Sequence, residues 1–86
     1  MVYFHARDLN LVMGPSAHGT SVRFRVALDG SPPRLAHGVD VDEQGDGMVA
    51  VQRLYQLIRQ PKPIADRRFE IEFLDVGAEA FVFTFG

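Results

Sequence analysis

The sequence contains no cysteine and no tryptophan, and it has only two tyrosines among its 86 residues. Without cysteine the chain can form no disulfide, no thiolate nucleophile and no zinc ribbon, and it has no thiol redox chemistry of its own. Charge is scarce as well, since 9 Lys and Arg against 11 Asp and Glu give a formal net charge of −2. That balance lacks the basic surface that nonspecific binding to nucleic acid or to an anionic membrane requires.

Long apolar runs are also missing, and the N-terminus has no basic region followed by an apolar stretch. We therefore expect no direct membrane insertion and no nucleic-acid partner. A chain of this length has room for one hydrophobic core, so residues 1–86 are predicted to form a single domain. It begins almost inside a strand at Val2 and stops directly after Phe85, which is typical of a domain excised from a longer protein.

What the sequence does contain is apolar residues at every second position, the period of a β-strand with one buried face. The clearest examples are residues 22–28 and 69–73, where valine, leucine, isoleucine and phenylalanine alternate with charged residues. Residues 81–85 are apolar on both faces, which predicts a central strand in the core.

Weaker strand patterns fill the rest of the chain. They cover residues 3–6 and 9–13, a predicted hairpin of 39–42 with 49–51, and residues 53–59, which also fit a short helical stripe. We favour a strand for 53–59, because Pro61 follows closely. About eight short strands with turn signals every 8 to 12 residues predict an all-β fold, an antiparallel, jelly-roll-like sandwich.

Two glutamates, Glu70 and Glu72, lie on one face of a predicted strand. Paired carboxylates at this spacing occur in glycoside hydrolases, but so small a domain seldom has the deep cleft that such an enzyme needs. We expect instead a cross-strand charge ladder in which Arg23 and Arg25 pair with the two glutamates.

The segment from Asp40 to Gly45 partly matches a calcium-binding loop. Asp40 and Asp42 stand at alternating positions and Asp46 could add an oxygen, but position twelve of the loop is Val51 rather than a bidentate carboxylate. An ordinary hairpin turn explains the same residues, so the three aspartates are weak calcium candidates and no metal site is predicted.

Other catalytic or cofactor-binding patterns are absent from the sequence. His5, His18 and His37 have no metal-ligand spacing, and the serines occur in turn contexts without a nucleophile elbow. The glycines form no phosphate-binding loop. We therefore expect no cofactor and no enzymatic activity.

A glycan-binding surface is the remaining possibility from the residues alone. It needs an aromatic platform beside planar polar side chains, and the best local candidates are Tyr55, Gln52, Gln56 and Arg59. Against this hypothesis, the chain has no tryptophan and its seven phenylalanines mostly occupy alternating positions typical of a core. Tyr55 can equally be a half-buried strand residue.

Several long strings resemble the C-terminal domain that follows the thioredoxin-like domain in bacterial redoxin-family proteins, including the DipZ-type cytochrome c biogenesis and thiol-disulfide interchange proteins. Together the strings cover nearly the whole chain: residues 6–15, 22–26, 37–42, 53–60, 64–75 and 80–86. Two positions depart from the expected pattern, Gln44 in the Asp-rich loop and Val76 before Gly77.

The resemblance implies a small β-sandwich similar to carbohydrate-binding modules, located at the C-terminus of a longer redoxin-type protein. The partner it implies is a covalently linked thioredoxin-like domain, and the parent would be a thiol-disulfide oxidoreductase. Two roles follow: a binding module for carbohydrate or a partner polypeptide, or a structural domain that docks on the thioredoxin-like domain. A membrane-anchored DipZ-like parent would place the domain outside the cytoplasm, and a soluble parent would leave it in the cytoplasm.

Overall fold

The computed structural model describes residues 1–17 and 19–86, and the regular secondary structure of this part of the chain is almost entirely β-strand. Strands form where apolar residues alternate, and turns form at Gly and Pro. The described residues contain seven strands and one 3₁₀ helix: β1 (Val2–Phe4), β2 (Asp8–Pro15), β3 (Val22–Leu28), η1 (Arg34–Ala36), β4 (Asp46–Val49), β5 (Arg53–Arg59), β6 (Arg67–Phe73) and β7 (Ala78–Phe85).

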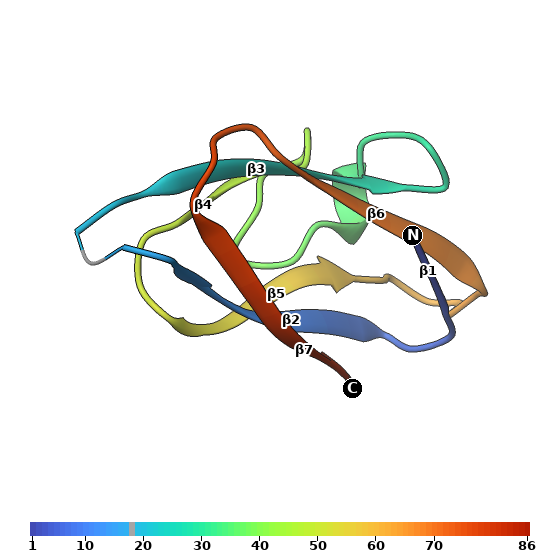
Figure 1. Ribbon diagram of the computed structural model, residues 1–86. Coiled ribbons are helices and arrows are strands. Elements are labelled where there is room, and N and C mark those ends of the chain that lie inside the picture. Colours follow the sequence, from blue (N-terminus) through green and yellow to red (C-terminus); the bar gives the residue numbers. More distant parts are fainter. Residues whose placement is uncertain (18) are drawn as a thin grey trace.

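The strands form two antiparallel sheets that face each other, as predicted for a β-sandwich. One sheet has the strand order β1-β6-β3-β4, and the other has the order β5-β2-β7. Every connection except that from β3 to β4 passes from one sheet to the other, as in a jelly roll. In Figure 1, β3 and β6 run through the upper layer, β2 and β5 through the lower one, and β7 crosses the near side obliquely.

The core lies between β3 and the strands β2 and β5. Phe24, Val26 and Leu28 of β3 face inward and are buried, and so are Leu9 and Leu57 of the opposite sheet. The side chains between them on β3, at positions 23 and 25, are exposed arginines. The period-2 pattern of residues 22–28 therefore predicted the buried face of this strand correctly.

A loop covers the outer edge of β5. Gly38 N donates to Leu57 O (2.9 Å) and Asp40 N donates to Gln56 O (3.1 Å), so the loop pairs with this edge as a strand would. Gly38 is required here, because a Cβ atom at this position would clash with the backbone carbonyl of Gln56. The β5 edge is consequently closed by the chain itself.

Two predictions about the strands were wrong. Residues 39–42 form turns rather than half of a hairpin, and β4 pairs with β3 instead. Residues 81–85 belong to β7, which lies at the edge of its sheet and not in its centre. The 53–59 segment is a strand, as predicted, and the described residues hold seven strands where about eight were expected. Within the described part of the chain, no helix is long and apolar enough to cross a membrane.

Candidate interaction surface

The last strand, β7, carries the most unusual surface of the molecule. It pairs with β2 on one side, with Leu9 opposite Phe85 and Leu11 opposite Phe83. Because opposed residues share a face of the sheet, Phe83 and Phe85 point toward the sandwich interior like the two leucines. The described residues place no strand on the other side of β7.

Three large apolar side chains of β7 remain about half exposed. The exposed fractions are 53% for Phe81, 52% for Val82 and 49% for Phe85. We call these three residues the β7 surface. An isolated exposed apolar residue is normal, and three within five consecutive positions make this edge strand a candidate interaction site.

Ring contacts hold the phenylalanines of β7 in place. The ring of Phe85 stacks on that of Phe4 with centroids 6.0 Å apart, and it lies 6.3 Å from that of Phe83. Phe83 in turn meets the ring of buried Phe69 edge-on, at 6.1 Å. The half-exposed Phe85 is thus continuous with the core through Phe83, which gives this part of the β7 surface an ordered base.

The apolar character continues onto the outer face of the sheet. Val82 lies across Val12 from Leu54, whose side chain is 48% exposed. Beside this apolar row lies a polar one, in which Asn10 Nδ2 donates to Thr84 Oγ1 (3.3 Å).

The predicted glycan-site residues are not gathered on one exposed face. Tyr55 is only 1% exposed, and its hydroxyl donates to Val51 O (2.7 Å), so its ring offers no platform to solvent. The side-chain oxygen of Gln56 accepts from Val39 N (3.2 Å). Gln52 and Arg59 are exposed. These contacts assign Tyr55 to the core, and a glycan site at this position stays a prediction.

Tyr55→Phe is expected to lower the free energy of unfolding by about 1 kcal/mol. The ring would still fill its core position, but the Val51 carbonyl would lose its donor and the Ala50 amide would lose an acceptor 3.3 Å away. Urea denaturation of both proteins measures the difference. An unchanged unfolding free energy would show that the hydroxyl contributes nothing to the fold.

The three calcium candidates are each engaged in other interactions. Asp40 accepts from Arg53 Nη2 (2.8 Å) and from Gln56 N (2.7 Å), and Asp42 Oδ1 accepts from the backbone N–H of Asp46 (2.9 Å). Asp46 itself accepts from Arg25 Nε (2.7 Å). Among residues 1–17 and 19–86, no group of three or more His, Cys, Asp and Glu side chains could hold a metal ion.

Two of the three histidines can be placed. His5 Nδ1 lies 2.6 Å from Asp66 Oδ1 on the surface, and His37 Nδ1 lies 2.9 Å from Val41 O within the loop that covers β5. His18 lies outside the described residues.

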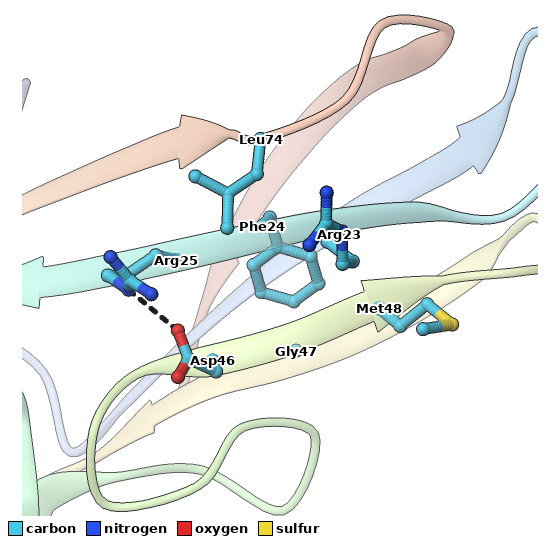
Figure 2. Close-up of a pocket in the computed structure, with 7 residues that line it drawn as sticks. All are labelled: Arg23, Phe24, Arg25, Asp46, Gly47, Met48 and Leu74. Carbon is cyan, nitrogen blue, oxygen red and sulfur yellow. Dashed lines mark hydrogen bonds and ion pairs between the residues drawn. The ribbon is translucent and has the colours of Figure 1, made fainter.

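The outer face of the β1-β6-β3-β4 sheet is charged, and its residues Arg23 and Arg25 are paired with carboxylates. A hollow of about 400 Å³ lies between β3 and β4. Figure 2 shows the residues that line it, among them Arg23, Arg25, Met48 and Leu74. Arg23 Nη2 donates to Asp75 Oδ1 (2.8 Å), and Arg25 Nε donates to Asp46 across the hollow. Because both guanidinium groups already have carboxylate partners, the hollow offers no unpaired charge to a ligand.

The predicted charge ladder was right about the strands and wrong about the partners. β3 does pair with β6, and Arg25 lies opposite Glu72 in the register. However, the closest ion pairs of Arg23 and Arg25 are with Asp75 and Asp46, while Glu70 pairs with Arg68. Sequence alternation predicted correctly that the arginines and glutamates share a face of the sheet. The carboxylates closest to the two arginines, however, lie in a turn and on β4.

Asp75 is the carboxylate whose titration is changed most clearly. The hydrogen bonds from the Arg23 side chain and then from its backbone N–H lower the pKa of Asp75 to about 2. A carboxyl group with a lowered folded-state pKa stabilises the fold above its unfolded pKa of about 3.9, and this contribution is lost as the pH falls through about 2.

Asp75→Asn is therefore expected to be less stable than the unchanged protein at pH 7, and the difference should shrink as the pH falls from about 4 to about 2. Urea midpoints measured between pH 2 and pH 7 test this. A difference that stays constant over that range would contradict an ionised Asp75 paired with Arg23.

The fold and its surface define a small β-sandwich that has no cysteine and carries one exposed apolar edge strand. Comparison with family models matches residues 1–86 to the thioredoxin-like C-terminal domain, so the chain belongs to this family. Searches of curated proteins and of solved structures found no significant match. The family indicates an accessory domain of a thioredoxin-like protein, and the lack of cysteine fits a non-catalytic role.

Proposed function

We propose that this domain is a structural accessory that docks on the linked thioredoxin-like domain through the β7 surface. The observation that carries the proposal is the half exposure of Phe81, Val82 and Phe85 on an edge strand, where the ring of Phe85 stacks on those of Phe4 and Phe83. A surface of this kind loses water-exposed apolar area when a partner covers it, which favours association.

The size of the β7 surface favours a partner in the same polypeptide. Two half-exposed phenylalanines and a half-exposed valine offer roughly 300 Å² of area. A stable interface between separate proteins buries about 800 Å² on each partner. A covalent linker compensates for the deficit, because it raises the effective concentration of the partner to about the millimolar range.

The other faces are less suited to docking. The outer face of the β1-β6-β3-β4 sheet already has its arginines paired with carboxylates, so a partner would have to replace ion pairs that exist. The opposite edge of the second sheet is covered by the loop around Gly38. Burial of Tyr55 weighs against the carbohydrate-binding alternative, and no contact favours it.

The parent protein of this proposal carries out thiol-disulfide exchange, as the DipZ-type proteins that the sequence resembles would do. Because this chain has no cysteine, it would contribute position and shape rather than electrons. Docking next to the redox site would narrow the set of substrates that can reach it.

A chemical-shift titration tests the proposal. The ¹⁵N-labelled chain is mixed with the unlabelled thioredoxin-like domain of its parent, expressed separately. We expect the largest shifts at Phe81, Val82 and Phe85, with no change at Leu35 in η1 and Val39 in the loop that follows it, which are 80% and 79% exposed. Shifts confined to the charged face, or no shifts at all, would overturn the proposal.

A further inference from the structure

The backbone of β7 also has hydrogen-bonding groups that point away from β2. Asp8 N donates to Gly86 O (3.1 Å) and Gly86 N donates to Asp8 O (3.2 Å), so these two residues form a hydrogen-bonded pair. In an antiparallel ladder such pairs alternate with non-bonded pairs. The register then directs the N–H and C=O groups of Val82 and Thr84 toward β2, and those of Phe83 and Phe85 toward the free edge.

The other sheet edges of the described chain are short or covered. β1 has three residues and β4 has four, while the β5 edge is paired with the loop at Gly38 and Asp40. β7 is eight residues long, and the only charged residue in it is Glu79. Proteins usually protect exposed edges with charges, proline, bulges or short strands, because a free edge pairs readily with other chains.

One such protective feature is present, and it limits the usable part of the edge. The β2–β7 register shifts between Val12 and Met13, which leaves Phe81 as the extra residue of a bulge. Bulges interrupt regular pairing. The edge that can accept another strand therefore runs from Val82 to Phe85.

We infer that this edge accepts an extended segment of the linked thioredoxin-like domain as an additional β-strand. The inference rests on the proposed docking function and adds its mode, which is main-chain pairing at Phe83 and Phe85 in addition to side-chain burial. Strand addition of this kind obtains affinity from backbone hydrogen bonds and specificity from neighbouring side chains. Here the half-exposed ring of Phe85 and the side chain of Val82 would flank the added strand on opposite faces.

The linked domain is favoured over a second copy of this chain. Self-association through the same edge would bury only the β7 surface, roughly 300 Å² on each copy. A stable dimer buries about 800 Å² per partner, which is far more. A tethered segment needs no such area. The matching family places the domain at the C-terminus of thioredoxin-like proteins, so that segment is present at high local concentration.

Amide hydrogen exchange resolved by NMR tests the mode of docking. The exchange rates of four amides, at positions 82 to 85, are measured in this chain alone and in the intact protein that includes the thioredoxin-like domain. In the chain alone, Val82 and Thr84 should be protected by β2, while Phe83 and Phe85 exchange freely. In the intact protein we expect exchange at Phe83 and Phe85 to slow at least 100-fold, with Val82 and Thr84 slow in both.

Each other outcome overturns the inference in a distinguishable way. If the NMR signals of the β7 side chains change but the amides of Phe83 and Phe85 still exchange freely, docking occurs without strand pairing. The proposed function then survives alone. If nothing changes at β7, both proposals fail. If Phe83 and Phe85 are protected in the chain alone and this protection rises with its concentration, the occupant is a second copy.

Discussion

Replacing Phe81 and Phe85 together by serine should shift the equilibrium between docked and undocked domains in the intact protein about 100-fold toward the undocked state, measured from the amide chemical shifts of β7. Each exposed half ring contributes roughly 1 to 1.5 kcal/mol when a partner covers it, and about 2.7 kcal/mol corresponds to that change in the equilibrium constant. The two rings supply most of the exposed area of the β7 surface, because both are about half exposed and the third residue, Val82, has a smaller side chain.

A matched control is available on the same molecule. Leu35 and Val39 are more exposed than either phenylalanine, but Leu35 lies in η1 and Val39 in the loop along β5. The Leu35→Ser, Val39→Ser double variant should dock as the unchanged chain does. Equal weakening by both double variants would mean that binding depends on exposed apolar residues anywhere on the surface, and it would contradict docking through β7. Circular dichroism of each variant confirms that it is folded.

The second large effect concerns stability. Phe24→Ala should lower the free energy of unfolding by about 3 to 5 kcal/mol, because it deletes a ring from the tightly packed centre of the core. Phe24 is 0% exposed, and its ring packs against the backbone of Gly47, where a Cβ atom would clash with it. A loss of this size is a large part of the stability of a small domain, so an unfolded fraction is expected at 25 °C.

Phe85→Ala provides the comparison, since it removes the same ring from β7. Its cost should be below about 1.5 kcal/mol, because the ring is half in water and contacts mainly Phe4 and Phe83. Urea denaturation of both variants gives the two values. Equal losses would show that β7 is a core strand of the domain and would remove the reason to propose a partner for it.

The sequence predicts the fold best where the alternation is strict. In residues 22–28, buried Phe24 and Val26 alternate with arginines, and one strand register satisfies all of them. The segment 53–59 was ambiguous between helix and strand. Its immediate end at residues 60–63 and its strand-like neighbours favoured a strand, and it forms β5.

The predicted hairpin failed for a local reason. Residues 39–42 alternate valine with aspartate, yet the two aspartates use their carboxylates to accept backbone N–H groups from Gln56, Gln44 and Asp46. Such local side-chain bonds compete with strand pairing and stabilise turns. Alternation alone does not reveal this competition, because it records where the aspartates stand and not which backbone groups their carboxylates bind.

The candidate surface was missed for a related reason. A strand that is apolar on both faces matches a central position in a sheet, and residues 81–85 were assigned there. An edge strand that a second domain covers needs the same pattern. Sequence periodicity records which faces avoid water, but it does not record whether the covering atoms belong to the same domain. The family match suggests which domain could cover β7, namely the thioredoxin-like domain.

The site predictions show the same limit. Tyr55 was a candidate platform because tyrosine is amphipathic, yet its hydroxyl is satisfied by Val51 and its ring by the core and by the Arg53 guanidinium, 3.8 Å from the ring centroid. Only three-dimensional contacts distinguish an exposed aromatic from one with internal partners.

The most direct test of docking through β7 is the solvent exposure of its phenylalanine rings in the intact protein. With fluorinated phenylalanine, a soluble gadolinium chelate broadens the ¹⁹F signal of each ring in proportion to its exposure. In the chain alone, Phe81 and Phe85 should broaden strongly and Phe24 hardly at all. In the protein that includes the thioredoxin-like domain, we predict that Phe81 and Phe85 become as protected as Phe24. Rings that stay as exposed as in the chain alone would contradict the account.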